Sequence, residues 1–283
     1  MNTQKKIAII GIGLMGGSLA LRLRAENLCT EIIGVDNNHQ HLQIALDQKI
    51  IDSGASLGDA IEAADVIIIA IPVDQTIAIL PTILNRVNKQ IVLDLGSTKS
   101  TILDAIEKHP KRERFIGTHP MWGTEKSGPG SVIRDAFINR AVVLCNHNDS
   151  NPEVFVWVKK MYETIGMRIV YMNALEHDLH VAYISHVSHI TSFALANTIL
   201  EKEKEETAIF DLASGGFEST VRLAKSSPSM WAPIFIHNKA NVLDVLDEHI
   251  TQLQKFQQAI AGANEDELMV LMNKANQIKK IIP

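Results

Sequence analysis

The sequence predicts an α/β domain built on a parallel sheet, followed by an all-α domain. In the first part of the chain, short apolar runs alternate with helical patterns, which is typical of strand–helix–strand units. From about residue 173 the strand-like runs stop and only long helical patterns follow. We therefore expect one domain over residues 1–172 and a second over residues 173–283.

Composition and charge describe an ordinary folded protein with no sign of a nucleic-acid or membrane partner. The 283 residues suffice for two domains; 46% are hydrophobic and 21% are charged. The net charge of −5 and the lack of a block of basic residues argue against binding to nucleic acid. The most apolar run, 66–73, contains Pro72 and is too short to span a bilayer. The N-terminus lacks a signal-peptide pattern, and two lone cysteines, Cys29 and Cys145, form no disulfide framework, so we expect a cytoplasmic protein.

Apolar runs and helical periodicity place the individual elements. The continuous apolar run at 66–71 indicates a strand that is covered on both faces. The charged run at 201–206 indicates an exposed turn or helix end. The expected strands of the first domain are 6–10, 31–36, 65–72, 90–97, 114–120 and 140–145, with helices at 14–26 and 153–165. The expected helices of the second domain are 174–200, 208–224, 229–261 and 264–280.

The first strand runs into a G-x-G-x-x-G pattern formed by Gly11, Gly13 and Gly16. The first glycine permits a tight turn, the second lets a diphosphate approach the backbone, and the third lets the helix pack close to the sheet. Free N–H groups at the start of the helix favour an anion there. A pattern that follows a strand and opens a helix predicts a Rossmann-type dinucleotide site. Neighbouring residues expected in this site are Leu14, Met15 and Ile71.

An acidic residue accompanies the glycine pattern at the end of the second strand. Asp36 lies twenty residues beyond Gly16, where a carboxylate accepts hydrogen bonds from ribose hydroxyls. Asn37 and Asn38 follow, with no arginine to neutralise a 2′-phosphate. The sequence therefore favours NAD over NADP, and a nicotinamide cofactor implies hydride transfer.

Polar groups follow two later strands, at the sheet edge where ligands bind in this fold. "GSTK" (96–99) supplies Ser97 as a hydrogen-bonding group. "GTHPMWGTEKSG" (117–128) supplies His119 at a strand end, then Glu125 in a glycine-rich loop long enough to act as a lid. A histidine here could be a structural cap, but its position at the ligand edge favours a general base.

The segment "HDLHVAYISHVSHI" carries four histidines and raises the question of a metal site. At about 100° per residue, His177 and His180 point one way, and His186 and His189 roughly the opposite way, so the four cannot converge on one ion. Neither pair has a cysteine or a clear carboxylate at metal spacing. Ser185 and His189 are four residues apart and share a helix face, which we interpret as a substrate-binding face. Packing and metal binding are the alternatives; we expect no metal.

Five segments, in order and at fitting spacing, resemble the prephenate/arogenate dehydrogenase family. They are "GIGLMGGSLA", "DLGSTK", "GTHPMWGTEKSG", "HDLHVAYISHVSHI" and "GGFESTVRLAKSSPSMW". The resemblance implies a Rossmann-type domain plus a helical domain that builds an intertwined homodimer. It also implies oxidative decarboxylation of prephenate to 4-hydroxyphenylpyruvate, with NAD reduced and CO₂ released.

The resemblance implies roles for individual residues. His119 matches the catalytic histidine that takes the proton of the ring hydroxyl, and Ser97 matches a serine that hydrogen-bonds the same region. Other matches are Glu125, an acid on the gating loop; Ser185 and His189, in the substrate site; Arg222, which binds a substrate carboxylate; and Trp231, at the edge of the site and within reach of the partner subunit. The chain looks like the bare catalytic core of the family.

Two features depart from the family pattern, and several alternatives stay open. Phe217-Glu218-Ser219 stands where "GFRD" is usual, and Val187-Ser188 stands where leucine-proline is common. Glu218 could also form a surface ion pair with Arg222 at i+4, in place of a substrate contact. Arogenate dehydrogenase is the alternative activity within the family. A β-hydroxyacid dehydrogenase or an imine reductase is a more distant alternative. The non-enzymatic alternative is a module that binds the cofactor as a sensor, without turnover.

Overall fold

The computed structural model describes residues 4–204 and 209–281. It contains an eight-stranded sheet in the order β3-β2-β1-β4-β5-β6-β7-β8. Neighbouring strands from β3 to β6 are parallel, which confirms the predicted parallel α/β sheet. The strands are β1 (Lys5–Ile10), β2 (Cys29–Val35), β3 (Ser53–Gly54), β4 (Val66–Ile69), β5 (Ile91–Asp94), β6 (Phe115–Pro120), β7 (Ala141–Cys145) and β8 (Arg168–Met172).

One strand of the sheet is antiparallel to its neighbour. β7 pairs antiparallel to β6, while β8 is again parallel to β7. The chain between β6 and β7 contains only a short 3₁₀ turn, η2 (Pro129–Ser131), and no crossover helix. A chain that returns without a crossover enters the neighbouring strand in the opposite direction. The glycine-rich segment after β6 is therefore a long connection over the ligand edge of the sheet.

Helices cover both faces of the sheet. Successive residues of a strand point to opposite faces, and here the residues on both faces are apolar and need to be buried. In β1, Ile7 and Ile9 pack into one core, which also takes side chains of α1 and α6. Ala8 and Ile10 pack into the other core, with side chains of α3, α4 and α5. The helices of this region are α1 (Leu14–Ala25), α2 (His39–Asp47), α3 (Leu57–Ala63), α4 (Val73–Arg86), α5 (Ser100–Asp104) and α6 (Pro152–Thr164).

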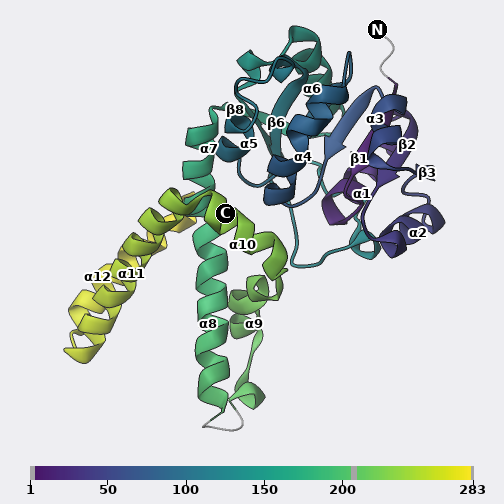
Figure 1. Cartoon of the computed structure of the whole chain (residues 1–283). Helices are drawn as coiled ribbons and strands as arrows, with labels where there is room; N and C mark the ends of the chain where they lie inside the picture. Colours follow the sequence, from purple (N-terminus) through teal and green to yellow (C-terminus); the bar gives the residue numbers. More distant parts are fainter. Residues whose placement is uncertain (1–3, 205–208, 282–283) are drawn as a thin grey trace. The chain divides into compact units, whose positions relative to one another are not determined.

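After β8 the described chain is helical, as predicted. Asn173 caps the first helix by accepting a hydrogen bond from the Glu176 amide at 2.8 Å. The helix runs through a π-helical turn into the longest helix of this region (Figure 1). The elements are α7 (Ala174–Val181), the π turn η4 (Ala182–His186), α8 (Val187–Glu203), η5 (Phe210–Leu212), α9 (Gly215–Val221), η6 (Arg222–Lys225) and α10 (Pro228–His237).

Two of the predicted long helices are wrong as continuous elements. The stretch expected at 208–224 is broken into η5, α9 and η6; residue 208 lies outside the described residues. Ser214 is extended before Gly215 and Gly216, and glycine disfavours a helix interior. The stretch expected at 229–261 is interrupted at Asn238, whose buried side chain bonds other parts of the chain. Of the charged run 201–206, residues 201–203 end α8, and 205–206 lie outside the described residues.

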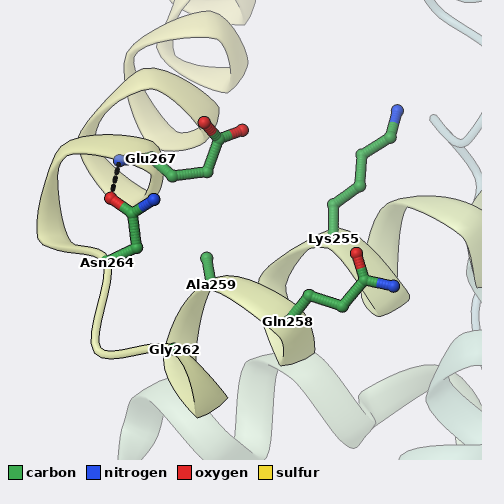
Figure 2. Close-up of a pocket in the computed structure, with 6 residues that line it drawn as sticks. All are labelled: Lys255, Gln258, Ala259, Gly262, Asn264 and Glu267. Atoms are coloured by element: carbon green, nitrogen blue, oxygen red, sulfur yellow. Dashed lines mark hydrogen bonds between the residues drawn. The ribbon is translucent and has the colours of Figure 1, made fainter.

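The chain forms two compact units, residues 1–238 and 239–283. The second contains α11 (Lys239–Ala261), α12 (Glu265–Ala275) and the 3₁₀ turn η7 (Asn276–Lys280). Asn264 starts α12 by accepting a hydrogen bond from the Glu267 amide at 3.0 Å (Figure 2). Ala263, in the turn between the helices, has a positive φ of 47°. Among the described residues, no helix is both long enough and apolar enough to cross a membrane.

Candidate active site

The glycine loop connects β1 to α1. In the sheet, β1 lies between β2 and β4, which is where the strand order changes direction. Gly11 has a φ of 93°, and a Cβ there would lie 2.5 Å from the Ala70 carbonyl oxygen. A Cβ on Gly16 would lie 2.1 Å from the Gly11 carbonyl oxygen. A Cβ on Gly13 would meet no protein atom within 4 Å. The first and third glycines are therefore required by packing, whereas the second faces open space in which a ligand can approach the backbone.

Asp36, after β2, ties the glycine loop to the next turn. Its Oδ2 accepts the Ile12 amide at 3.0 Å, and its Oδ1 accepts the Asn38 amide at 2.9 Å. Asn38 caps α2 by accepting the Gln40 amide at 2.9 Å. His41 Nδ1 lies 3.6 Å from Asp36 Oδ2. The carboxylate of Asp36 is thus held beside the glycine loop. Among the described residues, no lysine or arginine forms an ion pair with it.

The segment after β6 is anchored to the helix that begins at the glycine loop. Ser18 Oγ accepts the Ile133 amide at 2.9 Å. A Cβ on Gly17 would lie 2.5 Å from a Val132 side-chain carbon, so the two backbones approach closely. Leu14 is buried and Met15 is partly buried in α1, while Ile71 is partly buried after β4. The loop that carries Glu125 is therefore attached next to the predicted nucleotide site.

A buried ion pair supports the loop that carries Ser97. The side chains of Lys99 and Asp94 are both 0% exposed and form a salt bridge. Asp94 also accepts the Gly96 amide at 2.9 Å and the Thr118 amide at 3.2 Å. The loop after β5 is thereby fixed to the end of β6, and Ser97 itself remains partly exposed.

His119, at the end of β6, is joined to the start of the helical region. Its Nδ1 lies 2.8 Å from Nε2 of His177 in α7, and Nδ1 of His177 lies 2.8 Å from Oδ1 of Asp178. His177 is 0% exposed and Asp178 is 2% exposed, whereas His119 is partly exposed. Burial, followed by the neighbouring His177, Lys99 and His186, holds the pKa of His119 well below its usual range. His119 is therefore neutral at pH 7 and available to accept a proton.

The π turn places His186 differently from the prediction. Asn238 donates to the Asp178 carbonyl at 2.7 Å, and its side-chain nitrogen lies 3.2 Å from His186 Nδ1. His186 thus lies beside the turn that carries Asp178, and the prediction that it faces away from His177 is wrong. That prediction assumed an uninterrupted α-helix, and an i→i+5 turn changes the phase of every later residue.

Ser185, His189 and Trp231 lie together. His189 Nδ1 is 3.0 Å from the Ser185 carbonyl oxygen, and the His189 ring stacks on Trp231 with centroids 3.5 Å apart. Trp231 also meets His186 edge to face. Its indole nitrogen is buried and has no hydrogen-bond partner within the described chain. Burial, opposed by the bond to Ser185 and reinforced by Arg222, lowers the pKa of His189.

Arg222 pairs with an acid from the loop after β6. Its Nη1 lies 2.8 Å from Glu125 Oε2, and the arginine side chain remains 50% exposed. Ser192 of α8 accepts the Ala224 amide at 3.0 Å and donates to the Thr220 carbonyl at 3.0 Å, which fixes the chain around Arg222. The alternative of a surface salt bridge for Arg222 is therefore present, but with Glu125; the suggested partner Glu218 is wrong and instead lies 3.7 Å from Lys225.

The structure therefore groups the predicted residues into two connected sets. In the first set, His119 is hydrogen-bonded to α7, which also bonds the loop that carries Ser97. The second set consists of Ser185, His189 and Trp231. Arg222 is close enough to His189 to affect its pKa. Sequence reasoning missed Lys99, His177 and Asp178, although all three stand in segments it had singled out. No group of three or more His, Cys, Asp or Glu side chains in the described chain is arranged to hold a metal.

Comparisons with known proteins show similarity over nearly the whole chain. A family model described as "Prephenate dehydrogenase, nucleotide-binding domain" matches residues 19–171, and one described as "Prephenate dehydrogenase, dimerization domain" matches residues 173–274. A prephenate dehydrogenase of Bacillus subtilis is 31% identical, covering 100% of this chain and 78% of that protein. A cyclohexadienyl dehydrogenase of Zymomonas mobilis is 27% identical, covering 95% of this chain and 93% of that protein.

Solved structures show the same similarity. Prephenate dehydrogenase from Aquifex aeolicus, in complex with hydroxyphenyl propionate and NAD⁺, has a TM-score of 0.89 at 29% identity and covers 98% of both chains. Arogenate dehydrogenase from Synechocystis has a TM-score of 0.74 at 25% identity, over 98% of this chain and 100% of that chain.

Proposed function

Because this chain belongs to the prephenate dehydrogenase family, a family of oxidoreductases, we propose that it converts prephenate to 4-hydroxyphenylpyruvate and CO₂ with NAD as the oxidant. The observation that carries the proposal is the neutral, partly exposed His119 at the ligand edge of the sheet, bonded to the first helix of the helical region. A general base in that position suits the removal of a hydroxyl proton.

The glycine loop and Asp36 fit a dinucleotide. The close packing at Gly11 and Gly16 and the open space at Gly13 suit a diphosphate lying on the start of α1. The Asp36 carboxylate, held by two backbone amides, suits the ribose hydroxyls and disfavours a 2′-phosphate. Leu14, Met15 and Ile71 border the same loop. When bound, NAD supplies the hydride acceptor.

His119 would handle the proton in two stages. It first takes the proton of the ring hydroxyl as hydride leaves the same carbon. Loss of the ring carboxylate as CO₂ then leaves its electron pair in the ring, which becomes aromatic with a phenolate oxygen. His119 returns the proton to that oxygen, so the base is regenerated without net proton release. Ser97, partly exposed in the loop after β5, is placed to hydrogen-bond the same hydroxyl region.

Substrate carboxylates need cations or hydrogen-bond donors. Arg222 offers a guanidinium that is half exposed and bonded to Glu125 through Nη1, so it retains donors for a carboxylate. Ser185, His189 and the unpartnered indole nitrogen of Trp231 supply further polar groups nearby. Glu125 would compete with the substrate for Arg222 and so link the loop to binding.

We further propose a cytoplasmic homodimer, with the domain boundary near residue 172. The match to a dimerisation domain over 173–274 supports the dimer. Large apolar side chains on α7 and its π turn are exposed in the single chain; Leu175 is 74% and Ile184 is 67% exposed. Exposed apolar surface of this kind is typical of protein interfaces. The stacking of Trp231 on His189 supports a role for the tryptophan in the site of its own chain.

One assay tests the activity. Wild-type protein mixed with NAD and prephenate should produce NADH, seen by absorbance, together with CO₂. His119→Asn keeps some hydrogen bonding but cannot act as the base, so kcat should fall by about 10²–10⁴ with NAD binding retained. Turnover of arogenate in preference to prephenate would assign the alternative activity. A variant that keeps more than about a tenth of the activity would move the base elsewhere.

A further inference from the structure

His119 stands at the head of a chain of three polar side chains that leads into the protein. His119 Nδ1 meets His177 Nε2 at 2.8 Å, and His177 Nδ1 meets Asp178 Oδ1 at 2.8 Å. The outer ring is partly exposed, and the two inner groups are buried. Only the far nitrogen of His119, Nε2, is left for a substrate.

Asp178 is held firmly at the inner end. Its Oδ1 accepts the Lys99 amide at 2.8 Å, and its Oδ2 accepts the Ser100 amide at 2.8 Å. Its carbonyl accepts the Asn238 side chain at 2.7 Å. Burial alone would raise the pKa of Asp178, but bonds from His177 and the two amides outweigh burial and lower it. Asp178 is therefore an ionised carboxylate that can only accept hydrogen bonds.

The proton positions along the chain follow from this carboxylate. Since Asp178 only accepts, Nδ1 of His177 must carry a proton and donate it. Burial lowers the pKa of His177, so its ring is neutral at pH 7 and its Nε2 carries a lone pair. The bond between the two histidines then requires His119 Nδ1 to be the donor. The Nε2 atom of His119 is left as a proton acceptor.

We propose that His177 and Asp178 are positioning residues that hold His119 as its Nδ1–H tautomer and aim Nε2 at the substrate hydroxyl. The proposal rests on the assignment of His119 as the base. When His119 takes a proton, its Nδ1–H bond to His177 strengthens, and the Asp178 charge compensates the new cation across the His177 ring. Asp178 thus offsets the charge of Lys99, which opposes protonation of His119.

Histidine tautomers can be observed without turnover. Long-range ¹H–¹⁵N spectra of protein labelled with ¹⁵N-histidine, free of substrate, should show His119 as the Nδ1–H tautomer; its signals are those lost in His119→Asn. In His177→Phe, which keeps a ring but no acceptor, both tautomers should appear. An Nε2–H tautomer in the wild type would overturn the proposal. Because no substrate is used, this result is independent of whether the protein oxidises prephenate.

Kinetics separate a positioning role from a merely structural one. In Asp178→Asn the negative charge is lost, so the pKa of His119 falls and the acid limb of kcat/KM against pH moves to lower pH, by roughly half a unit or more. We expect kcat to fall by about tenfold to a hundredfold, which is at or below the about 10²–10⁴ expected for losing the general base itself. Glu176→Gln removes an exposed carboxylate from the same turn of α7 and should leave the limb in place. An unmoved limb in folded Asp178→Asn would overturn the proposal.

Two substitutions of His177 distinguish a positioning role from a general loss of folding. His177→Gln keeps an oxygen able to accept from His119 Nδ1 but breaks the connection to Asp178. It should therefore preserve the tautomer and more activity than His177→Phe. Equal activity of the two variants, with both folded by circular dichroism and both binding NAD as the wild type does, would contradict the proposal.

Discussion

Replacing Lys99 by methionine should destabilise the protein far more than removing an exposed lysine. The ammonium group of Lys99 and the carboxylate of Asp94 are both inaccessible to solvent and pair with each other. Methionine keeps the length of the apolar stem but leaves Asp94 without its cation. Removing one partner of a buried ion pair typically costs about 3–5 kcal/mol, because the remaining charge stays in a poorly solvating interior.

The lower end of that range applies here. Asp94 keeps two backbone hydrogen bonds, from Gly96 at 2.9 Å and from Thr118 at 3.2 Å. We expect Lys99→Met to lose about 3 kcal/mol, which for a domain of this size lowers Tm by about 6–12 °C. Thermal and urea unfolding followed by circular dichroism give both numbers.

Lys159→Met is the matched control. Lys159 lies on α6, 43% exposed and 3.8 Å from Glu163, and exposed pairs contribute about 0–1 kcal/mol. A loss below about 1 kcal/mol in Lys99→Met as well would refute the reasoning, since it would mean that Asp94 is not a buried charge that needs its lysine.

The same substitution makes a pH prediction. Burial and then the neighbouring His177 and Lys99 lower the pKa of His119. Removing the lysine charge should raise that pKa, so the acid limb of kcat/KM should move to higher pH. The shift is opposite in sign to the one expected for Asp178→Asn, and a shift in the same direction for both variants would contradict the electrostatic account.

Further substitutions at the glycine loop, at Asp36 and at Arg222 test the nucleotide and substrate sites. Gly16→Ala should lower Tm even without a ligand, because its Cβ would collide with backbone, whereas Gly13→Ala should leave Tm unchanged and weaken NAD binding by calorimetry. Equal Tm losses would contradict this distinction. Asp36→Ala combined with Asn37→Arg should shift the preference toward NADP; a wild type that uses both cofactors equally well would refute our interpretation of the carboxylate. Arg222→Ala should raise KM for prephenate by more than about tenfold with little change for NAD, and Arg222→Lys should recover part of the loss. Equal effects on both KM values would indicate a role in folding or assembly.

Local signals explain what the sequence could predict. Alternating apolar runs, the glycine pattern and the change to helical periodicity each depend on residues close together in the chain, so the α/β domain and the helical region that follows it were predictable. The same signals failed at 208–224 and 229–261. Helix periodicity there is continuous, but the breaks fall at Ser214, directly before Gly215, and at Asn238, whose side chain bonds residues of a distant turn.

The sequence by itself determined the fold class and the family, because both are encoded in short segments of neighbouring residues. Only the tertiary structure decided which side chains meet. His119 bonds His177 from 58 residues away, and Arg222 bonds Glu125 from 97 residues away. The π turn at 182–186 also changed the direction of His186 in a way that regular periodicity does not predict. Contacts of this kind depend on how packed elements are placed in space, and no local pattern of residues encodes that placement.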